Sequence, residues 1–199
     1  MAIEIKKFNN YTDYISLQKS KAPHGSPLNR RLSQDGDLWE SDCEGFHLNF
    51  KNHLEKIKKC TKGICLGART GQEVYVLKEI GLVDIIGIDL VDNPPLVIEG
   101  DVHNVQYGDN TFDFIFSNIF DHVLYPNKFV EEIERLSKPN TFCILHLSIN
   151  DKADFHAANV LSDAQSVLNL FSREIEILEN KPLGQKDWPA YWELVVNIK

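Results

Sequence analysis

The chain has 199 residues, of which 43% are hydrophobic and 25% charged, a composition that excludes an intrinsically disordered or fibrous protein. Its length predicts one domain, spanning residues 1–199, that buries a core without disulfides. With 21 basic and 29 acidic residues the net charge is −8, so a nucleic acid would be repelled and we expect no such partner.

The sequence carries no signal for a membrane or a metal. Residues 1–7 lack an apolar targeting segment, and no run of about 18 apolar residues occurs, so we expect a cytoplasmic protein without a membrane partner. The cysteines form no Cys-x-x-Cys pair, and the histidines lack the spacing or the cysteine partners of a zinc site. We therefore interpret the cysteines as reduced and expect no bound metal.

Residues 1–44 are predicted to form an N-terminal arm or lid within the domain. This segment is mainly polar and contains prolines and glycines, so it buries little surface by its pattern. Amphipathic turns, one or two in number, are indicated by the spacing of Tyr11, Tyr14, Ile15 and Leu17. We expect a partly ordered arm, followed at 45–59 by a helix whose apolar residues recur every three or four positions.

From residue 62 onward, short apolar runs alternate with helical patterns, as in parallel strands joined by crossover helices. Strands are expected at 63–66, 84–90, 96–101, 112–118, 141–148, 174–178 and 191–198, and helices at 72–80, 127–137 and 163–171. The last two strands are too close in sequence for a helical crossover and predict an antiparallel hairpin. The expected fold is therefore α/β and Rossmann-like, with a seven-stranded, mostly parallel sheet, an antiparallel C-terminal strand and helices on both faces.

The loop after the first predicted strand marks a candidate ligand site. Gly67 and Gly71 allow a tight turn before a helix that offers free N–H groups, while Asp89, Asp101 and Asn118 end the next three strands. Ligands of open α/β sheets bind beyond these strand ends, and an acid there can accept hydrogen bonds from a ribose diol. The alternative is that the glycines only make the turn and the acids only cap helices. Together, the residues favour a site for a nucleoside-type cofactor.

Four segments carry a resemblance to a known family. They are Cys65-Leu-Gly-Ala-Arg-Thr-Gly71, Gly100-Asp-Val-His-Asn104, Phe112-Asp-Phe-Ile-Phe-Ser-Asn118 with Asp121-His122, and the helical segment from Glu131 to Pro139. Over about residues 62–148 the chain resembles the class I S-adenosylmethionine-dependent methyltransferases of the type 11 branch. The resemblance implies that S-adenosylmethionine is the cofactor and that Asp101 contacts its adenine amino group.

The cofactor-binding residues that follow from the pattern and the resemblance are Gly67, Ala68, Arg69, Gly71, Asp89, Leu90, Asp101, Val102 and Asn118. Two residues depart from the family pattern. Cys65 stands where the family has an acid, and Arg69 replaces the middle glycine of the loop. Arg69 can pair with the carboxylate of the methionine moiety, point outward to solvent, or fill and close the pocket.

His122, with Asp121 beside it, is the predicted catalytic pair. A general base is needed only where the acceptor loses a proton, and histidine is the side chain whose ordinary pKa lies nearest neutrality. The alternative is that this imidazole packs on the cofactor or caps the short segment after the strand.

The methyl acceptor is expected to be a small molecule, recognised by the arm and by residues 148–159. Trp39, Phe46 and His47 form either a lid over the cleft or a hydrophobic staple that holds the arm down. Trp188 and Trp192 are expected to cover the sheet edge at the last hairpin.

Two further classes of function stay open beside the methyltransferase. One is a protein that kept the fold as a binding or scaffold protein and lost the reaction, as Cys65 and Arg69 allow. The other is a nicotinamide-dependent oxidoreductase, which the loop disfavours because it lacks the Gly-x-Gly-x-x-Gly spacing. The sequence does not specify the acceptor or the oligomeric state.

Overall fold

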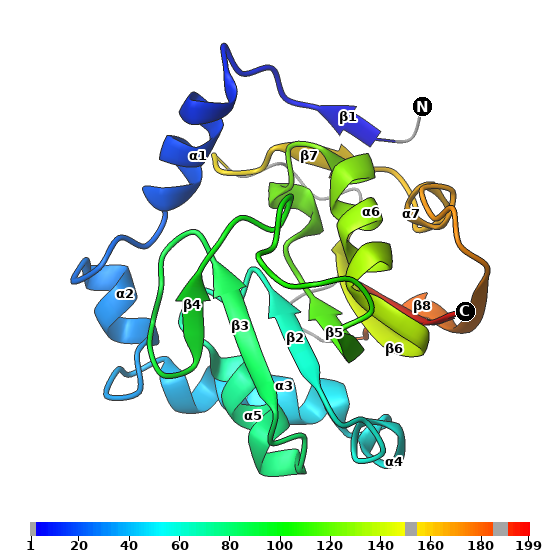
Figure 1. Cartoon of the computed structure of the whole chain (residues 1–199). Helices are drawn as coiled ribbons and strands as arrows, with labels where there is room; N and C mark the ends of the chain where they lie inside the picture. Colours follow the sequence, from blue (N-terminus) through cyan, green and yellow to red (C-terminus); the bar gives the residue numbers. More distant parts are fainter. Residues whose placement is uncertain (1–2, 150–154, 185–190) are drawn as a thin grey trace.

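The computed structural model describes residues 3–149, 155–184 and 191–199, and its centre is a seven-stranded sheet (Figure 1). The strand order is β4-β3-β2-β5-β6-β9-β8. The bounds are β2 Gly63–Leu66, β3 Ile85–Asp89, β4 Val97–Glu99, β5 Phe112–Ser117, β6 Ser137–Ser148, β8 Ile175–Pro182 and β9 Tyr191–Ile198. β9 lies antiparallel between β6 and β8, while the remaining pairs are parallel. The predicted sheet, with one reversed strand in the C-terminal hairpin, is confirmed.

Helices cover both faces of this sheet, as the sequence predicted. One face carries α3 (Trp39–Phe50), α4 (Leu54–Ile57) and α5 (Gln72–Ile80), and the other carries α6 (Pro126–Leu136) and α7 (Gln165–Leu168). Strand β5 shows why both are needed. Phe114 and Phe116 pack with the α3–α5 core, Ile115 packs with the α6–α7 core, and all three are fully buried. A strand that is apolar on both faces needs a helix layer on each.

The N-terminal arm contains one short strand and two helices before α3. It comprises β1 (Ile3–Ile5), α1 (Tyr11–Lys19) and α2 (Pro27–Leu32). Asn10 caps α1 by accepting the Asp13 N–H at 2.9 Å, and Ser26 caps α2 by accepting the Asn29 N–H at 3.1 Å. β1 pairs antiparallel with β7 (Asn159–Leu161) in a separate small sheet. The arm reaches across the carboxyl ends of the central strands (Figure 1).

Two predicted helices differ from those observed. The helix expected at 45–59 is two helices, because the chain turns between Phe50 and Leu54. The turn contains His53, whose buried Nε2 lies 3.1 Å from the Glu193 carboxylate on β9, so a buried polar contact replaces continuation of the helix. The helix expected at 163–171 is only the short α7.

Gly87, in the middle of β3, gives a direct test of how tightly the sheet packs on the loop after β2. An added Cβ at this position would lie 2.6 Å from the Ala68 Cβ, closer than real Cβ atoms approach. Gly87→Ala is expected to lower the free energy of unfolding by about 1–3 kcal/mol, as overpacked cores do. Urea unfolding measures the change.

The matched control is Gly108→Ala, where the nearest atom to an added Cβ is the Thr111 Oγ1 at 3.8 Å. This variant is expected to unfold within about 1 kcal/mol of the native chain. Equal unfolding midpoints for the two variants would contradict the packing described.

Candidate functional site

The loop between β2 and α5 turns by placing residues in the left-handed region of φ. Gly67 has φ 83° and Gly71 has φ 91°, and a Cβ at Gly67 would lie 2.5 Å from the Ile119 side chain. Arg69 also adopts a positive φ, 44°, although it carries a side chain. The loop therefore keeps the tight geometry that the family pattern assigns to three glycines, with arginine at the middle position.

Asp89, the last residue of β3, ties this loop to the neighbouring strand. Its carboxylate accepts the Arg69 N–H at 2.9 Å and the Val91 N–H at 3.3 Å. Burial raises the pKa of Asp89, while those two backbone donors and the Arg69 charge act in the opposite direction. The carboxylate is thus held in one position at the carboxyl end of β3.

A cleft of about 70 Å³ lies beyond the strand ends, between them and the arm. On the sheet side it is lined by Gly67, Arg69, Asp89, Leu90, Val91, Asp101, Val102, Ile119 and His122. On the arm side it is lined by Tyr14, Gln18, Lys19, Lys21, Ala22 and Asn29. Most of the residues predicted for the site therefore meet in one place.

Four predicted site residues lie outside the lining of this cleft: Ala68, Gly71, Asn118 and Asp121. Ala68 is buried beneath the loop, and Gly71 faces Leu96. The Asp121 carboxylate lies 3.6 Å from the His122 Nε2, beyond hydrogen-bonding distance. The cofactor contacts expected of Ala68, Gly71 and Asn118 therefore stay predictions.

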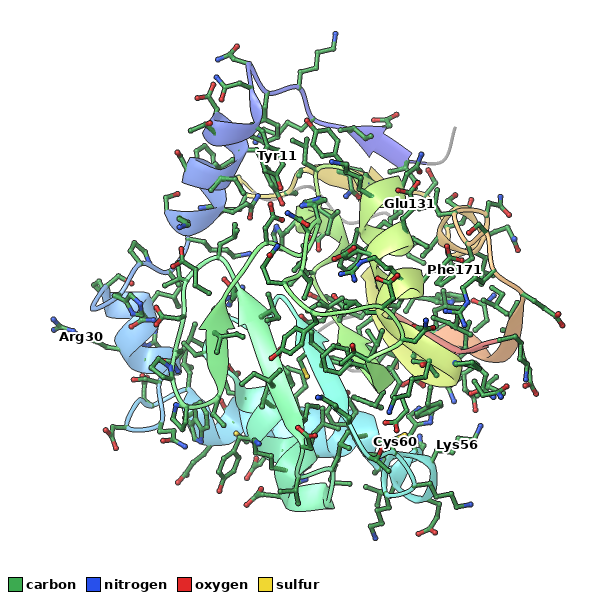
Figure 2. The ribbon with its side chains drawn as sticks, in the orientation of Figure 1. Tyr11, Arg30, Lys56, Cys60, Glu131 and Phe171 are labelled. Atoms are coloured by element: carbon green, nitrogen blue, oxygen red, sulfur yellow. The ribbon has the colours of Figure 1, made fainter. Side chains whose placement is uncertain are left out.

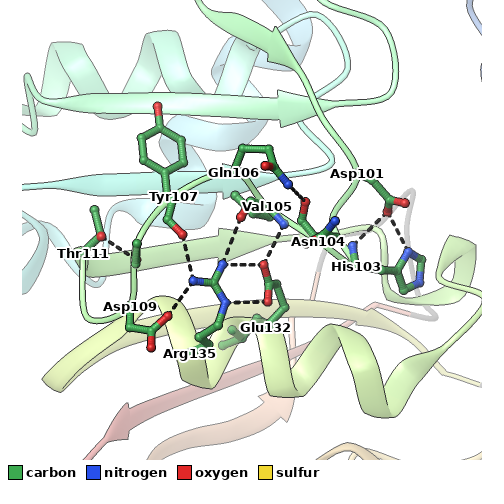
Figure 3. A network of polar contacts seen from close by, with 12 residues as sticks. Asp101, His103, Asn104, Val105, Gln106, Tyr107, Asp109, Thr111, Glu132 and Arg135 are labelled. Carbon is green, nitrogen blue, oxygen red and sulfur yellow. Dashed lines mark hydrogen bonds and ion pairs between the residues drawn. The ribbon is translucent and has the colours of Figure 1, made fainter.

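Asp101 is held by a compact network of hydrogen bonds (Figure 3). Its Oδ1 accepts the backbone N–H of His103 at 2.9 Å and the Nδ1–H of the same residue at 2.8 Å. The proton is on Nδ1 because Nε2 accepts the Tyr125 N–H at 3.3 Å. Its Oδ2 accepts the Tyr11 hydroxyl from α1. Burial alone would raise the pKa of Asp101, but these bonds from His103 and Tyr11 lower it to about 2.

A second network fixes the segment that follows β4 (Figure 3). The guanidinium of Arg135, on α6, donates to the carbonyl oxygens of Tyr107 at 2.7 Å and Val105 at 3.0 Å. Glu132, one turn earlier, pairs with Arg135 at 2.6 Å and accepts the Val105 N–H at 2.6 Å. Sequence reasoning missed this network, although an acid and a base three apart on a predicted helix were a readable signal.

His122 lies in a short 3₁₀ helix after β5 and is contacted by the arm. The Lys21 ammonium lies 2.8 Å from the Nε2 of His122, and the Tyr14 hydroxyl donates to its carbonyl at 3.0 Å. An ammonium is only a donor, so Nε2 accepts this hydrogen bond. In this arrangement the nitrogen expected to act as a base is already engaged by the arm.

The arm side of the cleft was not identified from the sequence. Tyr11 and Tyr14 were readable as one face of a helix, but nothing in that pattern shows which surface the face covers. Trp39 and Phe46 pack into the α3–α5 core, so of the two alternatives the packing role is observed and the lid is not. Within the expected acceptor segment, residues 150–154 lie outside the described residues, and so does Trp188.

The comparisons with known proteins agree with this geometry. Residues 64–145 match the family model described as a methyltransferase domain. No curated protein sequence matches the chain.

In the described part of the chain, no helix is long and apolar enough to cross a membrane, and no three His, Cys, Asp or Glu side chains are grouped to hold a metal.

Three solved structures illustrate the shared fold. The 1,6-didemethyltoxoflavin-N1-methyltransferase of Burkholderia thailandensis, with bound S-adenosylhomocysteine, is 13% identical with a TM-score of 0.69, covering 99% of this chain and 94% of that one. The PH0226 protein of Pyrococcus horikoshii is 19% identical with a TM-score of 0.63, covering 91% and 98%. A S-adenosylmethionine-dependent methyltransferase of Aquifex aeolicus is 18% identical with a TM-score of 0.55, covering 97% and 100%.

Glu73, in the first turn of α5, predicts a pH-dependent stability. It is 4% exposed, and burial raises its pKa to about 8. The folded protein therefore favours the protonated form of Glu73. As the pH rises above the pKa of glutamate in the unfolded chain, Glu73 lowers the free energy of unfolding, and this loss of stability grows until the pH reaches about 8. Glu73→Gln is expected to raise the free energy of unfolding by about 1–3 kcal/mol at pH 8 and to change it little at pH 4.5.

Thermal and urea unfolding at the two pH values measure this difference. Glu79→Gln, at the exposed end of the same helix, is the control, and loss of its exposed pair with His47 is expected to change the free energy of unfolding little at either pH. A Glu73→Gln effect of equal size at both pH values would contradict the assigned pKa.

Proposed function

We propose that the chain is a class I S-adenosylmethionine-dependent methyltransferase and that it transfers the methyl group of S-adenosylmethionine to a small-molecule acceptor. The match of residues 64–145 to the methyltransferase-domain model and the shared fold of the solved structures support this proposal. The observation that carries this proposal is the convergence of Arg69, Asp89 and Asp101 in one cleft, beside the N-terminus of α5. Two carboxylates and a guanidinium on an apolar floor have the chemistry that a nucleoside joined to an amino acid requires.

The residues present fit the cofactor part by part. The Asp89 carboxylate at the end of β3 suits the two hydroxyls of a ribose, and Asp101 suits the amino group of adenine. Leu90, Val102 and Ile119 supply the apolar surface for the flat ring. Gly67 allows Ile119 to pack against the loop, since a Cβ there would lie 2.5 Å from the Ile119 side chain.

Arg69 suits the carboxylate of the methionine moiety. Its side chain lines the cleft and makes no hydrogen bond or ion pair with another described residue. A guanidinium binds a carboxylate with charge-assisted hydrogen bonds that a glycine cannot make. The sequence left open whether Arg69 pairs with this carboxylate, points to solvent or closes the pocket, and the first of these is the role that we propose.

When bound, S-adenosylmethionine supplies an electrophilic methyl group, and the protein contributes by holding the acceptor in line with it. His122 is the residue proposed to accept a proton from an acceptor hydroxyl or amine, with Asp121 next to it in sequence. Its Nε2 becomes available for that role only when Lys21 releases it. Release of Lys21 therefore precedes any proton transfer to His122.

A small-molecule acceptor is the proposal that charge and similarity support. The net charge of −8 disfavours a nucleic acid. The Burkholderia structure contains the small molecule 1,6-didemethyltoxoflavin together with S-adenosylhomocysteine, in a chain of nearly the same extent.

Loss of the Asp89 carboxylate tests the cofactor site. Asp89→Ala is expected to weaken S-adenosylhomocysteine binding at least tenfold, because it removes the proposed ribose acceptor and the partner of the Arg69 N–H. Isothermal titration calorimetry measures the affinity. Asp84→Ala, at the opposite end of the same strand, is the matched control and is expected to bind as the native chain does. Absence of binding to the native chain would instead favour a fold relative that has lost the reaction.

Removal of the Arg69 side chain tests whether this residue binds the amino-acid part of the ligand and not the nucleoside part. Arg69→Gly is expected to weaken binding of S-adenosylhomocysteine by about 10- to 100-fold, as loss of a charge-assisted hydrogen bond does. Binding of 5′-methylthioadenosine, which lacks the amino-acid carboxylate, should stay unchanged. An equal loss for both ligands would show that Arg69 acts through the loop conformation and not through the carboxylate.

A further inference from the structure

The cleft has too little room for the ligand that its residues fit. Its volume is about 70 Å³, whereas pockets for drug-sized ligands and cofactors have about 300–1,000 Å³. Tyr14, Gln18 and Lys21 of the arm segment 11–22 line the cleft from above the strand ends and limit its volume. The arm must therefore move outward before a nucleoside can lie against Asp89 and Asp101.

Several contacts tie the arm to the sheet, and they differ in strength. Lys19 pairs with Glu99 at 2.8 Å, but both side chains are exposed. His24 pairs with Asp92 at 2.8 Å, again at the surface. Exposed ion pairs of this kind contribute little to stability. These two pairs are therefore expected to add little to the stability of the closed arm.

The contact between Tyr11 and Asp101 is different. It is partly buried, and its acceptor is a carboxylate, which makes it a charge-assisted hydrogen bond. The Tyr11 ring also stacks on Tyr125, with ring centroids 5.6 Å apart and an angle of 12° between the planes. Figure 2 shows Tyr11 on the inner side of α1, whereas Arg30 of α2 extends away from the molecule.

The hydroxyl of Tyr11 uses the one oxygen of Asp101 that His103 does not. Both donors of His103 contact Oδ1, and Tyr11 donates to Oδ2, with the Tyr11 hydroxyl oxygen also 2.9 Å from the His103 Nδ1. The donor on the arm therefore binds the atom that remains for an adenine amino group.

We propose that the contact of Tyr11 with Asp101 is a latch that keeps α1 closed over the cleft, and that the adenine of the cofactor opens it by replacing the Tyr11 hydroxyl at Oδ2. This inference rests on the proposed function, which assigns Asp101 to the adenine. Movement of α1 also withdraws Lys21 from His122, because Lys21 follows directly after this helix. Cofactor binding and release of the candidate base are thereby coupled through one helix.

The latch lowers the measured affinity, because a ligand that needs the open state binds in proportion to the fraction of open molecules. Tyr11→Phe removes the hydroxyl but keeps the ring that stacks on Tyr125. The variant is expected to bind S-adenosylhomocysteine about three- to tenfold more tightly than the native chain. In the absence of ligand, the backbone amides of α1 in the variant are expected to exchange hydrogen several-fold faster than those of the native chain. Calorimetry and hydrogen–deuterium exchange provide the two readouts.

Tyr107→Phe is the matched control, since the Tyr107 ring packs on Phe112, away from the arm. Faster exchange in α1 together with tighter binding supports the latch. Unchanged exchange overturns it, because Tyr11 then does not hold the arm. Faster exchange with weaker binding also overturns it, since the hydroxyl would then belong to the ligand's own pocket.

Failure of the proposed function has a separate signature. In that case the native chain does not bind S-adenosylhomocysteine at all, whatever the exchange of α1 shows, and the ligand-driven opening is refuted with it.

Discussion

The hydrogen bond from the Arg69 N–H to the Asp89 carboxylate is the contact on which the rest of the site depends. It joins the loop after β2 to the end of β3, at 2.9 Å, and stabilises a backbone conformation that an arginine adopts at a cost of about 1–2 kcal/mol. Gly71 then begins α5 directly behind the loop. Together with the hydrogen bonds from the Gly67 and Ala68 N–H groups to the Ile88 carbonyl, this bond fixes the loop against the carboxyl end of β3.

The two carboxylates at the strand ends are positioned by different means, and this difference has a functional consequence. Asp89 is held by backbone donors of its own and the neighbouring loop, which cannot leave without unfolding the site. Asp101 is held by His103 and by Tyr11, and only the second of these comes from the arm. One acid is therefore a fixed part of the sheet, while the other has a partner that can be exchanged for a ligand.

The sequence was sufficient for the sheet and the loop because both depend on local patterns. The apolar runs at 63–66 and 112–118 and the glycines at 67 and 71 specify strands and a turn within a few residues of themselves. The arm could not be placed in the same way, since Tyr11 and Asp101 are 90 positions apart. The break in the helix expected at 45–59 has the same origin, because His53 finds its partner Glu193 at a separation of 140.

The charges around the cleft also explain why an arginine is tolerated in the loop. Asp89 and Asp101 are acids on the sheet side, and Arg69 is the cation that faces them, with Lys21 opposite on the arm. A ligand with both a positive sulfonium and amino group and a negative carboxylate would find a complement to each charge in such a cleft. With glycine at position 69 the sheet side would present acids without a cation, and the carboxylate of that ligand would lose its complement. Under the proposed function, Arg69 is therefore assigned to the amino-acid end of the ligand.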